Sequence, residues 1–118
     1  MSTITQMITI KGVLSARPGR FEDAKAEATA LWSKTLGKRG VIAYQFFTDE
    51  ATQRIEVIEM YEDSEAMLNH IATSSFDGLL DTVDIDSIEL FGDPSTELVS
   101  KLESFGSPLG LYPTLCHA

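Results

Sequence analysis

Cysteine and histidine are scarce in this chain of 118 residues, and their scarcity excludes several kinds of site. With one cysteine, Cys116, the chain has no intramolecular disulfide, and a reducing cytoplasm is the simplest location. The two histidines, His70 and His117, lie far apart in the sequence, and neither has a carboxylate at metal-ligand spacing. We therefore expect a cytoplasmic protein without a metal site.

Basic residues are also few. The chain has 9 Lys and Arg against 18 Asp and Glu, which gives a net charge of −9. Such a chain repels a nucleic-acid backbone, and the basic group at Lys34, Lys38 and Arg39 stands where cations complement a helix end. No apolar run approaches the roughly 18–20 residues that span a bilayer, and no signal peptide is visible. The sequence thus predicts no nucleic-acid partner and no membrane association.

Sequence motifs for bound cofactors are missing too. There is no glycine-rich phosphate loop, no dinucleotide fingerprint and no Gly-x-Ser-x-Gly motif. If the chain is an enzyme, we expect it to need no cofactor. Its 43% apolar and 23% charged residues are ordinary for a globular protein, and 118 residues form one domain with its own core. We expect a single domain over residues 1–118.

The spacing of apolar residues divides the first half of the chain into strands and a helix. Residues 4–14 alternate, which predicts a strand. Residues 21–36 carry an apolar stripe at helical spacing and end at Gly37, a residue suited to a left-handed helix end. Strands over 41–48 and 54–61 are predicted on either side of a hairpin loop. The expected inward residues are Ile4, Ile8, Ile10 and Leu14 of the first strand, and Phe21, Ala24, Ala28, Leu31, Trp32 and Thr35 of the helix.

The second half continues with a helix capped by Asp63 or Ser64 and a strand over 84–91. Residues 76–82 fit either a short helix or an irregular turn. A last helix over 95–105 is expected to open with Pro94 at its first position, followed by a short strand or arm over 109–116. The order β-α-β-β-α-β predicts an α+β, ferredoxin-like split βαβ fold, with an antiparallel sheet and helices on one face.

The two middle strands are apolar on both faces, whereas a sheet with one wet face alternates cleanly. Val57 and Tyr61 lie on one face of the third strand, and Ile58 and Met60 lie on the other. Helices cover only one face of such a sheet. We therefore expect the other face to pack on a second copy of the chain, which gives an isologous homodimer.

A resemblance rests on the order of several residues. The run Gly40–Tyr44, the triplet Glu59-Met60-Tyr61 leading into a helix, and then His70 and Phe76 resemble the antibiotic biosynthesis monooxygenase family. The similarity covers about residues 4–93, and the tail over 94–118 resembles an extension found in some members. The resemblance implies a dimeric α+β barrel. Members include cofactor-free oxygenases that turn quinols or anthrols into quinones.

Two departures from the family pattern bear on activity. Tyr61 stands where tryptophan is usual. Ser75 occupies the position of a later histidine that haem-degrading members use as iron ligand, and Asn69, the only asparagine, is not on the first strand. Haem degradation is therefore disfavoured.

The candidate catalytic residues are His70, Glu59 and Tyr44. His70 falls on the inward stripe of its helix, where it is either a proton acceptor or a core histidine bonded to the sheet. Glu59 is placed either to orient the imidazole or to face water at an edge. Tyr44 either orients a phenolic substrate or packs with its hydroxyl at the barrel rim.

The candidate substrate-binding residues are mostly aromatic. Trp32 fits either plain core packing or stacking on a substrate, and Tyr61 shares the alternatives of Tyr44. Asn69 is expected to face solvent or a cavity edge, while Phe46 and Phe76 complete the set. Two functions stay open: a monooxygenase acting on a small electron-rich aromatic, and a non-catalytic dimeric barrel that binds a small apolar ligand.

Overall fold

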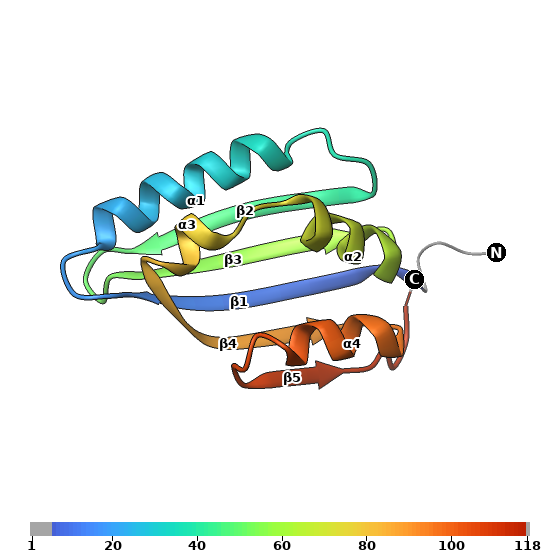
Figure 1. The fold of residues 1–118 in the computed structure, drawn as a ribbon. Coiled ribbons are helices and arrows are strands. Elements are labelled where there is room, and N and C mark those ends of the chain that lie inside the picture. Colours follow the sequence, from blue (N-terminus) through green and yellow to red (C-terminus); the bar gives the residue numbers. More distant parts are fainter. Residues whose placement is uncertain (1–5, 118) are drawn as a thin grey trace.

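Strand β1 (Ile8–Ala16) is the central strand of the sheet. The computed structural model describes residues 6–117. The sheet has five strands in the order β2-β3-β1-β4-β5, and the helices all lie on one face of it (Figure 1). The other strands are β2 (Val41–Asp49), β3 (Arg54–Tyr61), β4 (Val83–Phe91) and β5 (Leu109–Tyr112). The helices are α1 (Phe21–Thr35), α2 (Ser64–Thr73), α3 (Asp77–Leu80) and α4 (Thr96–Glu103).

The ferredoxin-like arrangement is confirmed, and one further strand is added to its sheet. β1 pairs antiparallel with β3 and β4, and β2 pairs antiparallel with β3. The expected antiparallel sheet is formed by β1 to β4, and β5 adds a strand parallel to β4. Helix α4 is the cause, since a parallel neighbour needs a crossover that carries the chain back along the sheet. The sheet is therefore mixed.

The alternation of β1 places its apolar side chains under the helices. Ile8, Ile10 and Leu14 are buried, as the pattern predicts, whereas Ile4 lies outside the described residues. The inward stripe of α1 is confirmed except at Trp32, which is 39% exposed. Leu31, the residue before it, belongs to the buried core, and Trp32 is turned away from that core around the helix.

Each of the two longer helices after β3 begins with a side-chain cap. Asp63 accepts a hydrogen bond from the Ala66 amide at 2.8 Å, and Ser95 accepts one from the Leu98 amide at 3.1 Å. Pro94 therefore precedes the cap. The prediction that Pro94 is the first residue of this helix is wrong. The undecided stretch after α2 contains the single turn of α3.

Gly40, just before β2, sets the distance between that strand and α2. Its φ is +82°, and a Cβ there would lie 2.5 Å from the Cβ of Ala66. Any other residue would meet both left-handed backbone strain and this contact. The glycine thus lets α2 approach the start of β2.

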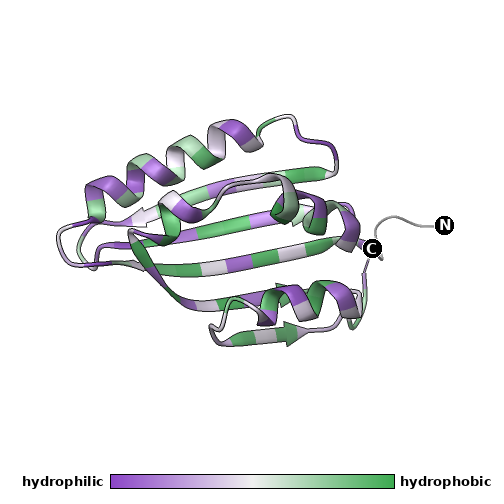
Figure 2. Ribbon diagram, viewed as in Figure 1, coloured by the Kyte–Doolittle hydropathy of each residue, from purple (hydrophilic) through white to green (hydrophobic). Residues whose placement is uncertain are grey.

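The strands carry both hydrophilic and hydrophobic residues (Figure 2). Strand register places both kinds on the helix-free face of the sheet, where Lys11 lies opposite Ile58. Strand register places Val13, Ile58 and Phe47 there, and Phe91 stacks on Tyr112 with ring centroids 5.0 Å apart. Phe47 is 51% exposed. None of the helices within residues 6–117 has the length and apolar character that a membrane crossing requires.

Candidate functional site

A cavity of about 100 Å³ lies between the sheet and the helices. Its floor is β1, where Gly12 has no side chain and leaves space between Ile10 and Leu14. A Cβ at Gly12 would lie 2.9 Å from a methyl group of Val57. The walls are almost entirely apolar, and the few polar groups on them are those of Glu59, Tyr44 and His70.

Glu59 brings a carboxylate into this apolar space from the middle of β3. It lies opposite Tyr44 in the ladder between β2 and β3, and two residues from Tyr61 on the same strand face. The Tyr61 hydroxyl donates a hydrogen bond to Glu59 Oε1. Tyr61 is fully buried and does not line the cavity, so its hydroxyl group holds the Glu59 carboxylate from the side away from the cavity.

Burial governs the acidity of these three groups. It raises the pKa of Glu59 to about 7, although the Tyr61 hydrogen bond opposes the shift. Part of the Glu59 side chain is accessible, but it lines the cavity, so it is still largely removed from bulk water. Burial, and next the negative charge of Glu59, raise the pKa of both Tyr44 and Tyr61. Both phenols therefore stay protonated at neutral pH.

His70 enters from α2, where Met67 and His70 form the buried stripe. The imidazole is 1% exposed and is surrounded by three aromatic rings. Its centroid lies 5.1 Å from that of Tyr44, 5.8 Å from that of Tyr61 and 5.6 Å from that of Phe76. His70 thus joins the aromatic residues of β2, β3 and the loop after α2.

The two nitrogens of His70 have different surroundings. Nδ1 lies 3.1 Å from the hydroxyl of Ser74, whereas Nε2 is buried and has no hydrogen-bond partner among residues 6–117. Burial, and next the charge of Lys38, lower the pKa of His70 to about 4. The imidazole is therefore neutral at physiological pH.

The structure brings together most of the residues that the sequence suggested. His70, Glu59, Tyr44, Phe46 and Phe76 all line the cavity. Tyr61 supports Glu59 and His70 from behind the cavity wall. Trp32 and Asn69 are exposed and do not line the cavity.

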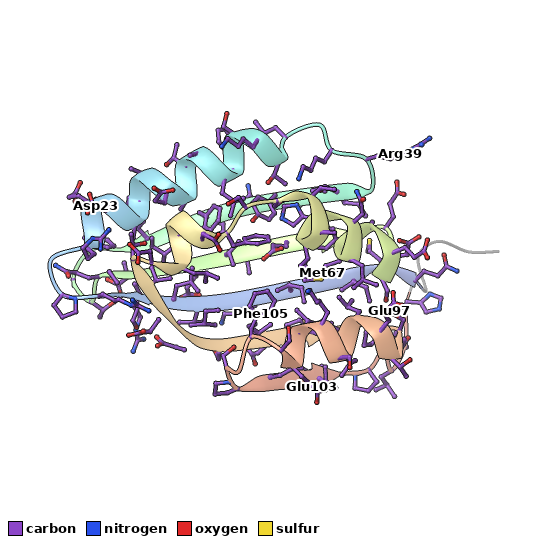
Figure 3. The ribbon with its side chains drawn as sticks, viewed as in Figure 1. Asp23, Arg39, Met67, Glu97, Glu103 and Phe105 are labelled. Atoms are coloured by element: carbon purple, nitrogen blue, oxygen red, sulfur yellow. The ribbon has the colours of Figure 1, made fainter. Side chains whose placement is uncertain are left out.

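Several residues of the site were missed by the sequence reasoning. Leu102 of α4 and Phe105 just after it line the cavity together with Ile85 and Ile88 of β4. Figure 3 shows Phe105 and Met67 in the region between α2 and α4. The apolar spacing of α4 predicts that one face of this helix is buried, but it does not predict which part of the sheet the helix covers. Nothing in the sequence marks Ser74 or Lys38 as part of a site, because polar residues are common at helix ends and in loops.

The arrangement suits proton transfer with a small aromatic ligand. A carboxyl group whose pKa lies near neutrality, in an apolar cavity with aromatic walls, can take a proton from a weakly acidic ligand. Within residues 6–117, no three His, Cys, Asp or Glu side chains are grouped so that they could hold a metal ion.

Comparison with known proteins gives a family match. The family model described as Antibiotic biosynthesis monooxygenase matches residues 7–79, which is more than half of the chain. No curated protein matches the sequence. The matched part contains every cavity residue up to Leu79, whereas α4 and β5 lie beyond it.

Solved structures share the fold at low sequence identity. MupZ from Pseudomonas fluorescens superposes with a TM-score of 0.75 and 19% identity, covering 96% of this chain and 94% of its own. A conserved protein from Methanosarcina mazei Go1 superposes with a TM-score of 0.68 and 15% identity, covering 77% of this chain and 96% of its own. A Caulobacter crescentus CB15 protein named for the same family superposes with a TM-score of 0.65 and 18% identity, covering 78% of this chain and 93% of its own.

Proposed function

The chain belongs to the antibiotic biosynthesis monooxygenase family, and from this premise we propose that it oxidises a small, electron-rich phenol or quinol with O₂, without a cofactor. The family match supports the class of reaction. The contents of the cavity support the kind of substrate and the residues that act on it.

The observation that carries the proposal is Glu59 in its aromatic surroundings. A general base works best when its pKa lies near the working pH, and burial raises the pKa of Glu59 to about 7. Tyr44, Phe46 and Phe76 supply ring edges and faces against which a second aromatic ring packs well. Tyr61 holds the carboxylate in place.

Glu59, rather than His70, takes the role of proton acceptor in this proposal. The sequence favoured His70 because imidazole ordinarily titrates near neutrality. Burial and the charge of Lys38 lower the pKa of His70 to about 4, which makes its neutral ring a weak base. The buried carboxyl group, with a pKa of about 7, is the stronger base of the two.

The proposed reaction balances without another reductant. Glu59 takes the phenolic proton, and the resulting phenolate gives one electron to O₂. Superoxide and the phenoxyl radical then combine at a ring carbon to form a peroxide. Its O–O bond breaks, one oxygen atom stays on the ring as a carbonyl, and the other leaves as water with two hydrogen atoms from the substrate. The ring supplies all four electrons that O₂ accepts.

The size of the cavity limits the substrate. An engineered cavity of about 150 Å³ in another protein holds benzene, so a cavity of about 100 Å³ fits one ring at most unless its walls move. A one-ring quinol therefore suits this cavity better than a three-ring anthrol.

The helix-free face supports a homodimer. Phe47, Phe91 and Tyr112 leave exposed aromatic surface on it, with Val13 and Ile58 between them. A second copy packed face to face covers this surface and closes an α+β barrel.

Oxygen consumption with a panel of one-ring quinols tests the proposed function. We expect one O₂ consumed per quinol, with one ¹⁸O atom from ¹⁸O₂ in the quinone, and a loss of about 10²–10⁴-fold in Glu59→Gln. Glu56→Gln, on the same strand but the opposite face, is the matched control. Quinols that bind in the cavity without any oxygen consumption would instead support the second function, a non-catalytic ligand-binding barrel.

A further inference from the structure

A chain of hydrogen bonds connects Lys38, outside the cavity, with His70 inside it. Lys38 Nζ lies 2.8 Å from Ser74 Oγ, and Ser74 Oγ lies 3.1 Å from His70 Nδ1. Lys38 and Ser74 also line a groove on the outer side of the same wall. The cavity and the groove thus meet at this pair of hydrogen bonds.

The direction of the first hydrogen bond is fixed by chemistry. An ammonium group has three donors and no acceptor, so the Ser74 oxygen must accept from Lys38. The neighbouring hydroxyl behaves in the same way: Thr73 Oγ1 accepts from Lys38 at 3.2 Å and donates to the carbonyl oxygen of Asn69 at 2.7 Å. In both cases the hydroxyl proton points away from the ammonium group.

Among the described residues, His70 Nδ1 is the acceptor within reach of the Ser74 hydroxyl proton. If Nδ1 carried a proton instead, it would donate to Ser74 Oγ, and the Ser74 hydroxyl would have no acceptor among the hydrogen bonds of the described residues. With Nδ1 as acceptor, the single proton of the neutral imidazole resides on Nε2.

We infer that Lys38 and Ser74 are positioning residues that hold His70 as its Nε2–H tautomer, so that this N–H donates a hydrogen bond to an oxygen atom of a ligand in the cavity. The second observation that points to a ligand is Nε2 itself. This nitrogen atom is buried, it belongs to a 1%-exposed residue that lines the cavity, and it has no hydrogen-bond partner in the part of the chain that the structure describes. A buried N–H group without an acceptor is costly, and a ligand oxygen relieves that cost.

The inference rests on the proposed function only for the identity of the ligand. A phenol that has lost its proton to Glu59 carries negative charge on its oxygen, and an N–H donor already in place stabilises that charge. Lys38, behind Ser74, disfavours a second proton on the ring. Tyr44 and Tyr61, the other titratable groups packed on the imidazole, stay neutral at physiological pH.

Two-bond ¹H–¹⁵N correlation spectra of the imidazole test the tautomer without any substrate, because the two neutral forms give different cross-peak patterns. We expect the Nε2–H form for His70 in the wild type. Ser74→Ala should give a mixture of tautomers, and Ser74→Thr, which keeps the hydroxyl, should restore the single form. In Lys38→Met, the His70 pKa should rise from about 4 toward its ordinary value of 6.5.

Lys34→Met is the matched control, since Lys34 lines the same outer groove but makes no hydrogen bond to Ser74. It should leave the His70 spectrum unchanged. An Nδ1–H tautomer in the wild type, or identical His70 spectra in the wild type, Ser74→Ala and Lys38→Met, would overturn the inference. A protein without oxygenase activity that still shows the expected spectra would refute the proposed function alone.

Discussion

Tyr61 donates a hydrogen bond to the carboxylate of Glu59 from two residues further along the same face of β3. The tyrosine is fully buried, and the glutamate lines the cavity. Strand alternation alone places the two side chains side by side, so the pair forms without any loop. Strand β3 therefore presents the Glu59 carboxylate to the cavity, held by its neighbour on the strand.

The raised pKa of Glu59 predicts a pH-dependent cost in stability. The pKa is about 7 in the folded protein and near 4.5 when unfolded, so the contribution of Glu59 is most favourable below about pH 4.5 and is lost as the pH rises through 7. Glu59→Gln removes this cost. We expect the variant to gain about 1–3 kcal/mol relative to wild type between pH 5 and pH 8, measured by urea unfolding. Equal pH dependence in both proteins would show that Glu59 titrates normally.

The lowered pKa of His70 predicts that its contribution to stability changes with pH in the opposite direction. Its folded pKa of about 4 lies below its ordinary value of 6.5, so its contribution is fully present above pH 6.5 and is lost as the pH falls through 4. His70→Gln should be less sensitive to acid than wild type by about 2–3 kcal/mol between pH 7 and pH 4. Because the two groups oppose each other over this range, each is read from the difference between wild type and its own variant. A variant that loses stability in acid as wild type does would rule out the low pKa.

Phe105 predicts the size limit of the cavity. It is half-buried and closes the cavity beside Leu102, so Phe105→Ala should enlarge the space at a cost of about 1–3 kcal/mol in unfolding free energy. Calorimetry with two-ring phenols should then show binding that the wild type lacks. Leu115→Ala, at a residue 96% exposed, is the control and should bind as wild type does. Equal binding of two-ring phenols by wild type and Phe105→Ala would show that Phe105 does not limit the cavity.

The helix-free face predicts the oligomeric state. Burial of its exposed aromatic side chains implies an interface of about 2,000 Å² or more. Light scattering at micromolar concentration should give about twice 13.0 kDa. Phe47→Asp, which places a charge on the exposed aromatic surface at the β2 edge of the sheet, should lower this mass toward that of one chain. A wild-type monomer would contradict the barrel.

The sequence predicted the fold well because its local signals agree with each other. Alternation in β1, the stripe of α1 and the Asp63 cap each reflect interactions within a few residues, and all three appear in the structure. Trp32 was misplaced because the edge of a helical stripe is decided by the neighbouring elements. β5 was expected only as a short strand or arm, since its direction depends on how α4 crosses the sheet.

The site was predictable only where its residues lie on the strands and helices of the core. Glu59, Tyr44 and His70 follow from periodicity, because inward positions of adjacent elements converge. Their relative basicity does not follow, since it depends on burial and on Lys38, which is distant in sequence from His70. Ser74 connects these two residues only after the chain has folded.

The pH dependence of kcat/KM for a one-ring quinol tests the central claim most directly, since it reports the titration of the base in the free enzyme. Glu59 must be ionised to accept a proton, so kcat/KM should rise with pH and level off above an inflection near 7. Tyr61→Phe removes the hydrogen bond that opposes the shift, and should move that inflection to higher pH. An inflection near 4, where His70 titrates, or an unchanged profile in Glu59→Gln would contradict the assignment of Glu59 as the base.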